Sequence, residues 1–177
     1  IDKGADKGAL ITYERPILEA DSGEPLCTIS QTMLERGDGG YGGPQRSAPA
    51  PHTVPERAPE HIIDLVTAEN MALLYRLNGD WNPLHADPQV AAKAGFQRPI
   101  LHGLATWGLA GRAIMQAVCA FDGRQIASIF GRFTAPAYPG ETFRTEIWVD
   151  GPVISFRVRS VERDVVVINN GRAELRG

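Results

Sequence analysis

The feature that most restricts the fold is one apolar helix in the second half of the chain. Between residues 103 and 119 apolar side chains recur at helical spacing, and small residues fill most of the remaining circumference. A helix that is apolar on nearly every side is expected to be buried. Each glycine within it costs about 1 kcal/mol relative to alanine, so we expect another backbone to approach closely there. The apolar positions are Leu104, Trp107, Gly111, Ile114, Met115 and Val118, with Gly108, Ala110, Ala113 and Ala117 between them.

Strand-like segments follow this helix to the end of the chain. In residues 142–149 apolar and polar side chains alternate with period two, which predicts a strand with one buried face. The short connections at 150–151 and 162–164 suit antiparallel hairpins. We therefore predict an α+β domain in which an antiparallel sheet packs on the buried helix. The predicted strands are residues 125–133, 142–149, 152–161 and 164–175.

The first sixty residues are organised differently. Residues 9–18 and 25–35 have the pattern of two strands joined by a turn, and a lone hairpin of this kind is marginally stable in water. Residues 37–60 carry five glycines and five prolines in 24 positions, which predicts a flexible linker more strongly than a ligand-cradling loop. Because the sequence begins at Ile1 rather than at Met, we expect that further chain precedes it.

Shorter elements are expected between the linker and the long helix. Residues 61–66 predict a strand. Residues 67–79 predict a helix that begins with Thr67 as N-cap and ends at Gly79. A second short helix is predicted at residues 88–96, with a proline in its first turn.

Composition and charge exclude several classes of protein. A net charge of -3 and an isoelectric point near 5.8 give no general reason to expect nucleic acid as a partner. The two cysteines, Cys27 and Cys119, are too far apart for a zinc ribbon and too few for a disulfide framework, which favours a reducing compartment. No run of 18 apolar residues and no signal sequence is present, so we expect no membrane association and no export.

The stretch "GDWNPLH", residues 79–85, carries the candidate chemistry. Pro83 forces an extended backbone at Asn82, so the loop is stiff. A carboxylate from Asp80 and an imidazole from His85 can hold one water between them, and an imidazole can pass a proton in either direction near neutral pH. Taken singly, Asp80 could equally be a turn aspartate that bonds its own backbone, and His85 a packed histidine at a domain edge.

The start of the long helix is a second candidate group. Gly103 lies where backbone N–H groups are free and the helix dipole is positive, so a developing oxyanion could bind there, worth roughly 3 kcal/mol in a transition state. His102 is expected to be structural because no nucleophile is paired with it. Asp80, His85, Asp87 and His102 match no established metal-ligand spacing, so no metal is expected.

The sequence around these groups resembles a known family. "YRLNGDWNPLHADPQVAAKAGFQRPILHGLATWG" resembles the hydratase-2 motif of the (R)-specific enoyl-CoA hydratases, within the MaoC-like dehydratases of hot-dog fold. The similarity continues through "RFTAPAYPGETFRTEIW" to the end of the chain and back to "DKGADKGA", and is greatest to the two-hot-dog form in peroxisomal multifunctional enzymes. It implies a catalytic hot-dog domain at residues 61–177 and, at residues 1–36, the closing strands of a preceding hot-dog domain that is much longer in the family.

The resemblance also implies an activity. It is the reversible syn hydration of trans-2-enoyl-CoA to (3R)-3-hydroxyacyl-CoA in fatty-acid β-oxidation or related acyl-CoA metabolism, with no metal or redox cofactor. Which of the two side chains takes the proton from water is left open, because it depends on neighbours that tune each pKa. The residues implied are Asp80, His85 and Gly103 for catalysis, and Trp81, Asn82, Pro83, Leu84, Phe133 and Lys3, with Lys7 as a rival, for substrate binding.

Two other functions are compatible with the fold. A hot-dog thioesterase would attack the thioester carbonyl, and a non-catalytic acyl-CoA-binding subunit would use the same residues only to shape a pocket. The placement of Asp80 and His85 together with Gly103 favours the hydratase. We further expect a homodimer formed through edge strands, in the cytoplasm of a bacterium or the peroxisome of a eukaryote.

Overall fold

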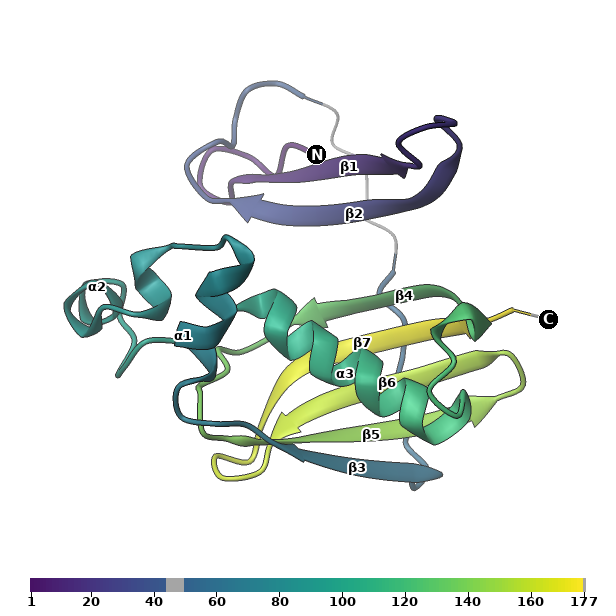
Figure 1. The fold of residues 1–177 in the computed structure, drawn as a ribbon. Coiled ribbons are helices and arrows are strands. Elements are labelled where there is room, and N and C mark those ends of the chain that lie inside the picture. Colours follow the sequence, from purple (N-terminus) through teal and green to yellow (C-terminus); the bar gives the residue numbers. More distant parts are fainter. Residues whose placement is uncertain (44–49, 177) are drawn as a thin grey trace. The chain divides into compact units, whose positions relative to one another are not determined.

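The computed structural model describes residues 1–43 and 50–176, which form two compact units, Ile1–Ala50 and Pro51–Gly177. The first unit is an antiparallel hairpin of β1 (Ala9–Leu18) and β2 (Pro25–Glu35), which confirms both strands predicted there (Figure 1). The register pairs Ala9 with Glu35 and continues to the turn, with one irregularity near Ile17.

The glycines after β2 are part of the first unit. The buried Asp2 carboxylate accepts hydrogen bonds from the backbone N–H groups of Gly4, Gly40 and Gly42 at 2.8–2.9 Å. These bonds, that from Gly40 above all, lower the pKa of Asp2 below its usual value. A β-carbon on Gly39 would lie 2.1 Å from the Gly4 carbonyl oxygen, so only glycine fits. This end of the predicted linker is therefore fixed by contacts, whereas its residues 44–49 lie outside the described residues.

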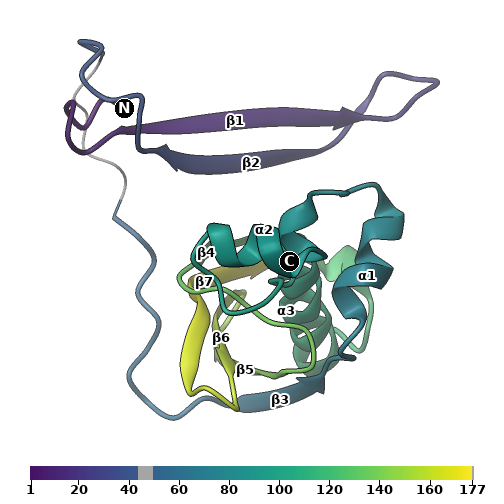
Figure 2. The ribbon, with the colours of Figure 1, turned by 90° about the vertical axis from the view of Figure 1, so that its left-hand side faces the viewer.

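The second unit is one sheet and one long helix. Five antiparallel strands follow the order β3-β5-β6-β7-β4, and α3 (Gly103–Val118) lies across one face of them (Figure 1). Figure 2 shows how the sheet curls around the helix. The predicted α+β architecture, a long helix wrapped by an antiparallel sheet, is confirmed. The strands are β3 (His61–Val66), β4 (Ile126–Phe133), β5 (Thr142–Asp150), β6 (Val153–Ser160) and β7 (Val165–Leu175).

The core lies between the inner face of α3 and the concave face of the sheet. Full burial of each large apolar side chain there stabilises the fold by about 1.5–3 kcal/mol before entropy is counted. The members that exclude solvent completely are Ile114, Ala110 and Ala113 of the helix and Phe143, Ile147, Ile154, Phe156, Val158, Ile168 and Ala173 of the sheet.

The prediction that α3 is buried on all sides is wrong for the described residues. Leu104 is 68% exposed, and a β-carbon on Gly108 or Gly111 would have no neighbour within 4 Å. The reason is that a sheet can cover only one side of a helix. Within residues 51–176 the glycines therefore do not mark a backbone contact, and the sheet leaves the outward face of α3 uncovered.

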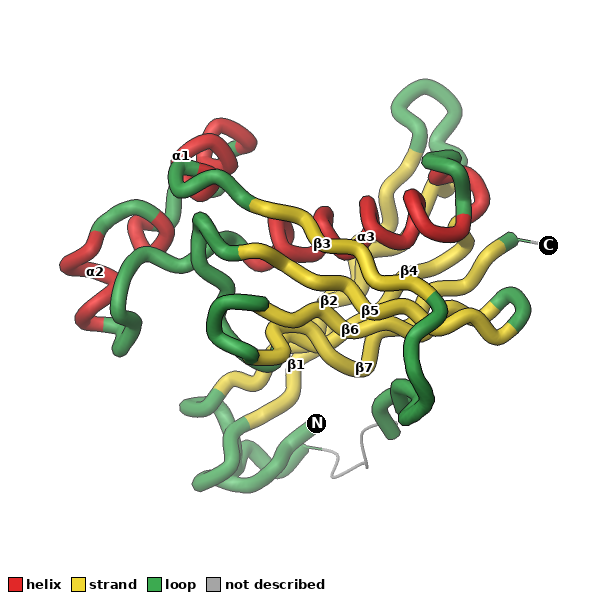
Figure 3. The backbone as a smooth tube through the Cα atoms, turned by 90° about the horizontal axis from the view of Figure 1, so that it is seen from below, coloured by secondary structure: helices red, strands yellow, loops and turns green. Residues whose placement is uncertain are grey.

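The helix predicted at residues 67–79 is shorter than expected and begins elsewhere. The buried Thr67 hydroxyl donates to the Glu141 carbonyl at 2.7 Å and accepts from the Gly140 N–H, so it is not an N-cap. The helical part is α1 (Met71–Tyr75), continued by a 3₁₀ turn η1 (Arg76–Asn78), and Gly79 ends it in the left-handed region with φ 101°. Beyond one end of the strands, α1 lies with α2 (Pro88–Lys93), which Asp87 caps (Figure 3).

The segment before β3 is a strap across the outer side of the sheet. The Trp148 indole N–H donates to the Arg57 carbonyl at 2.7 Å, and the Asn170 side chain donates to the His52 carbonyl at 2.7 Å. The Val149 N–H donates to the Glu60 carboxylate at 3.1 Å. Trp148 is buried although it faces away from the core, because this strap covers it. Residues 51–60 of the predicted linker are thus held to the sheet.

None of the helices within residues 1–43 and 50–176 has the length and hydropathy needed to cross a bilayer.

Candidate active site

The loop after α1 holds Asp80 at its start and His85 at its end. Pro83 opens a second 3₁₀ turn, η2 (Pro83–His85), and the Asn82 side chain caps it by accepting from the Leu84 N–H at 3.0 Å. The Asp80 carboxylate accepts from the Asn82 N–H at 3.3 Å. The predicted stiffness of the loop therefore has two sources, the proline ring and a side-chain cap.

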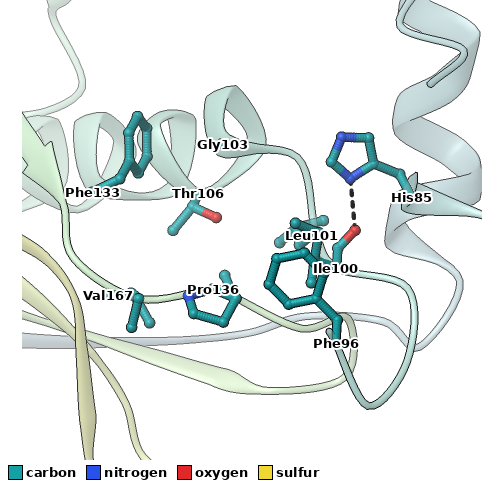
Figure 4. Close-up of a pocket in the computed structure, with 11 residues that line it drawn as sticks. His85, Phe96, Ile100, Leu101, Gly103, Thr106, Phe133, Pro136 and Val167 are labelled. Carbon is teal, nitrogen blue, oxygen red and sulfur yellow. Dashed lines mark hydrogen bonds between the residues drawn. The ribbon is translucent and has the colours of Figure 1, made fainter. Parts of the chain in front are cut away.

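The His85 ring is fixed by a backbone carbonyl from another segment. Its Nδ1 lies 2.8 Å from the carbonyl oxygen of Ile100 (Figure 4). A carbonyl oxygen only accepts, so Nδ1 carries the hydrogen and Nε2 is left as a proton acceptor. His85 is 9% exposed. This partner could not be predicted from the sequence, because a backbone carbonyl has no residue-type signal.

A second histidine lies against the first. The His102 and His85 rings are stacked with centroids 3.7 Å apart, and the Tyr75 ring is tilted against His102 with its centroid at 4.5 Å. The Nε2 of His102 is 3.3 Å from the Asp80 carbonyl oxygen. Burial first, and then the charge that His85 can carry, lower the pKa of His102 below the ordinary histidine value.

Asp80, His85 and His102 form one cluster. Their nearest carboxylate and ring atoms all lie within 4.8 Å of one another. The structure therefore brings Asp80 and His85 together beside the tip of α3, as the sequence predicted. The cluster suits a metal ion poorly, since the lone pairs of stacked imidazoles lie in nearly parallel planes and do not converge on one point. The donor set fits a hydrogen-bonded pair that shares a water better.

The first residue of α3 offers an unoccupied donor. The N–H groups of Ala105 and Thr106 bond to the His102 carbonyl, whereas among the described residues no acceptor meets the N–H of Gly103. The positive end of the helix dipole adds to this donor. A β-carbon on Gly103 would lie 3.3 Å from the Phe133 ring, so glycine leaves room at the helix tip.

A cavity of about 250 Å³ opens between these groups. Figure 4 shows His85 and Phe133 on opposite sides of the space below Gly103. Its walls are mostly apolar, which suits a hydrocarbon tail. The lining residues are His85, Phe96, Ile100, Leu101, Gly103, Thr106, Phe133, Ala135, Pro136, Ala137 and Val167.

The residues predicted to bind substrate divide into two groups. Phe133 lines the cavity, as His85 and Gly103 do. Trp81, 72% exposed, and the loop residues Asn82 to Leu84 do not line it. Lys3 and its rival Lys7 are exposed residues of the first unit.

Sequence reasoning missed most of the cavity wall. Thr106 and Val167 sit in regular elements and look like ordinary core residues, so no local signal distinguished them. Phe96 and Ile100 lie in the connection before α3, where an apolar "PIL" run beside "HG" was the only available sign.

An aromatic and ionic clamp holds the Ile100 segment in place. The Leu101 N–H donates to the Ala137 carbonyl at 2.7 Å, and Arg98 donates to the Pro139 carbonyl at 2.9 Å. The guanidinium groups of Arg98 and Arg163 both lie over the Tyr138 ring, at 5.0 and 4.8 Å from its centroid. The clamp joins the segment that orients His85 to the segment that forms the cavity wall.

A long helix in a curled antiparallel sheet, with an aspartate and a histidine on one loop facing the helix tip, defines a hot-dog domain of the dehydratase type. The chain belongs to the MaoC like domain family, whose model matches residues 51–171.

Similar proteins carry related names. The chain is 44% identical over 152 residues to 3-hydroxyacyl-thioester dehydratase Y of Mycobacterium tuberculosis, covering 85% of this chain and 52% of that protein. It is 40% identical over 185 residues to the peroxisomal enoyl-CoA hydratase 2 of Arabidopsis thaliana, covering 99% and 59%. The crystal structure of a MaoC-like dehydratase from Phytophthora capsici superposes with a TM-score of 0.92 at 36% identity, covering 99% of this chain and 61% of that one. The chain thus spans little more than half the length of these relatives.

Proposed function

We propose that this chain carries the catalytic site of a hydratase that adds water to the C2=C3 double bond of a trans-2-enoyl-CoA and catalyses the reverse dehydration. The observation that carries the proposal is the approach of the Asp80 carboxylate and the His85 ring, within 4.8 Å, beside a cavity that Gly103 also lines. The names of the relatives, enoyl-CoA hydratase 2 and 3-hydroxyacyl-thioester dehydratase, support it.

Asp80 and His85 hold and activate the water. His85 has its Nδ1 hydrogen bound to Ile100, so its Nε2 can accept a proton from water while the Asp80 carboxylate orients the same molecule. The water oxygen adds to C3 and a proton is delivered to C2. Because both groups act from one side of the double bond, the addition is syn and gives the (3R)-3-hydroxyacyl-CoA.

Gly103 stabilises the charge that develops on the thioester oxygen. As C3 accepts the water oxygen, electron density moves to the carbonyl oxygen and gives an enolate-like state. The free N–H at the tip of α3 donates to that oxygen, and one such donor is worth about 3 kcal/mol in a transition state.

The apolar cavity receives the acyl chain. Phe133 forms one wall of it. We assign contacts with the CoA portion to the loop residues Trp81, Asn82, Pro83 and Leu84 and, from the first unit, to Lys3. We propose no metal ion and no redox cofactor, since hydration changes no oxidation state overall and the stacked imidazoles suit a metal poorly.

The wider assembly follows from the same family assignment. We propose that β1 and β2 are the closing strands of a preceding hot-dog domain, and that residues 61–177 are the catalytic domain. We also propose a homodimer, because the edge strands β3 and β4 expose Ile62 and Phe130. A monomer in light scattering would contradict the homodimer.

The compartment proposed is the bacterial cytoplasm or, in a eukaryote, the peroxisome.

The test follows crotonyl-CoA and a C10 trans-2-enoyl-CoA by the absorbance of the conjugated thioester. Wild type should consume both, and Asp80→Asn and His85→Gln should each lower kcat about 100- to 10,000-fold. Matched controls are Asp122→Asn, at a turn after another helix, and His61→Gln, on the edge strand β3, which should stay near wild type. If the wild-type protein consumed neither substrate, the proposed hydratase function would be wrong.

The same assay separates the alternatives. A thioesterase would release free CoA thiol, which a thiol reagent detects, while a hydratase would not. A non-catalytic subunit would bind the acyl-CoA without consuming it.

A further inference from the structure

One buried histidine touches all three residues of the proposed catalytic group. His102 stacks on the ring of His85 with centroids 3.7 Å apart. Its Nε2 lies 3.3 Å from the carbonyl oxygen of Asp80, and its own peptide bond leads directly to Gly103. His102 has no role in the proposed hydration step itself.

Stability does not explain a histidine at this position. His102 is 1% exposed, and within the described residues its Nδ1 has no hydrogen-bond partner. The Asp80 carbonyl can only accept, so Nε2 carries the hydrogen and Nδ1 is a buried, unpaired acceptor. Such an atom costs folding free energy, and a phenylalanine ring, slightly larger, would remove it together with the hydrogen bond to the Asp80 carbonyl. The imidazole is therefore retained at a cost, which indicates a role in the site.

We propose that His102 is a positioning residue that fixes Asp80 and His85 relative to the tip of α3. The stacked ring sets the plane in which the His85 imidazole lies. The Nε2–H holds the Asp80 carbonyl and, with it, the start of the catalytic loop. Because His102 immediately precedes Gly103, one residue ties the water-activating pair to the oxyanion donor. This role rests on the proposed hydration.

The charge state of His102 agrees with this role. Burial and the neighbouring His85 lower its pKa, so at neutral pH the ring is uncharged. An uncharged ring can stack on His85 without repelling the proton that His85 takes up during the reaction. The Tyr75 ring also packs against His102, with centroids 4.5 Å apart.

The experiment compares His102→Phe and His102→Gln with wild type in the full chain, using crotonyl-CoA and urea unfolding. In His102→Phe we expect kcat to fall about 10- to 100-fold, since misplaced catalytic groups lose rate of that order, with KM within about twofold. Its unfolding midpoint should stay near that of wild type, because loss of the hydrogen bond to Asp80 offsets removal of the unpaired Nδ1. His102→Gln keeps an amide donor for the Asp80 carbonyl and should recover part of kcat. His52→Phe, the same change on the outer side of the sheet, is the matched control and should keep wild-type kcat.

A double variant tests whether His102 acts through the pair. If it acts through the pair, the loss of kcat in His85→Gln with His102→Phe should be clearly smaller than the product of the two single losses, because groups that act as a unit are not additive. Full additivity of the two losses would overturn the proposal. So would a His102→Phe chain that is less stable but turns over at the wild-type rate, which is the result of a purely structural role.

The tautomer of His102 gives a readout that does not depend on turnover. Long-range ¹H–¹⁵N spectra of histidine-labelled protein at pH 7 should show His102 neutral with its hydrogen on Nε2. A hydrogen on Nδ1, or an imidazolium, would overturn the positioning role whatever the activity. If the wild-type protein shows the expected tautomer but consumes neither thioester, both the proposed hydratase function and the positioning role are wrong. If the wild-type protein is active and His102→Phe is equally active, only the positioning role is wrong.

Discussion

His85 and Ile100 are joined by a hydrogen bond between a ring nitrogen and a backbone carbonyl oxygen 2.8 Å apart. The bond decides which nitrogen of His85 faces the cavity with a free lone pair. It also makes the catalytic geometry depend on a segment that carries no catalytic side chain. The clamp of Arg98, Tyr138 and Arg163 holds that segment against the loop that forms the opposite wall.

Loosening this clamp should reduce turnover. Arg98→Ala removes a charged hydrogen bond to the Pro139 carbonyl and a cation–π contact with Tyr138, at a cost of about 2 kcal/mol in unfolding free energy. The Ile100 carbonyl then moves more freely, so kcat should fall several-fold. Arg98→Lys keeps the charge but not the planar guanidinium, so its kcat and its unfolding free energy should lie between those of wild type and Arg98→Ala. Urea unfolding and crotonyl-CoA kinetics check both quantities, and an unchanged kcat in Arg98→Ala would show that the clamp does not orient His85.

Two glycines of α3 allow a matched comparison. In Gly103→Ala the new methyl group lies 3.3 Å from the Phe133 ring and beside the proposed oxyanion donor, so kcat should fall by at least tenfold. In Gly108→Ala the methyl group meets nothing within 4 Å, so activity should stay and unfolding free energy should rise by about 0.5–1 kcal/mol. Equal activity in the two variants would argue against Gly103 as the donor.

The strands and the long helix could be predicted because their signals are local. Period-two alternation in residues 142–149 placed β5 (Thr142–Asp150), and the run beginning at Gly103 placed the start of α3. The start of α1 could not be predicted, since Thr67 bonds to Glu141, 74 positions away, and local capping rules cannot see such a partner. Trp148 breaks the alternation for a similar reason, because the strap that buries it lies in a segment whose prolines and glycines indicate only irregular backbone.

The candidate site was predictable only in part. Asp80 and His85 lie on one short loop, so their proximity follows from the sequence around Pro83. Their supports do not, since they come from the backbone of Ile100 and from the ring of His102. The outward face of α3 was predicted to be buried because its residues are apolar or small. Composition does not show whether another segment covers such a face.

The two histidines with lowered pKa should make stability depend on pH. Burial lowers the pKa of both His52 and His102 in the folded chain, while each titrates near 6.5 when unfolded. Between the folded pKa and pH 6.5 the unfolded chain binds more protons, so stability rises with pH across that window and levels off above it. Unfolding free energy measured from pH 5 to 8 should therefore fall on the acid side. His52→Gln and His102→Gln should each reduce the slope of unfolding free energy against pH. An unchanged slope in both variants would show that these histidines do not cause the pH dependence.

Partial filling of the cavity should change chain-length preference without loss of the chemistry. Val167 of β7 lines the cavity, away from the water-activating pair. In Val167→Phe the larger ring occupies part of the 250 Å³ that a long acyl tail would use, at an overpacking cost of about 1–3 kcal/mol in stability. The value of kcat/KM should fall much more for the C10 enoyl-CoA than for crotonyl-CoA, whose four carbons end near His85 and Gly103. Val161→Phe, in the exposed turn after β6, adds the same ring outside the cavity and should leave both substrates unaffected. If Val167→Phe lowers kcat/KM equally for both substrates, the acyl tail does not enter this cavity.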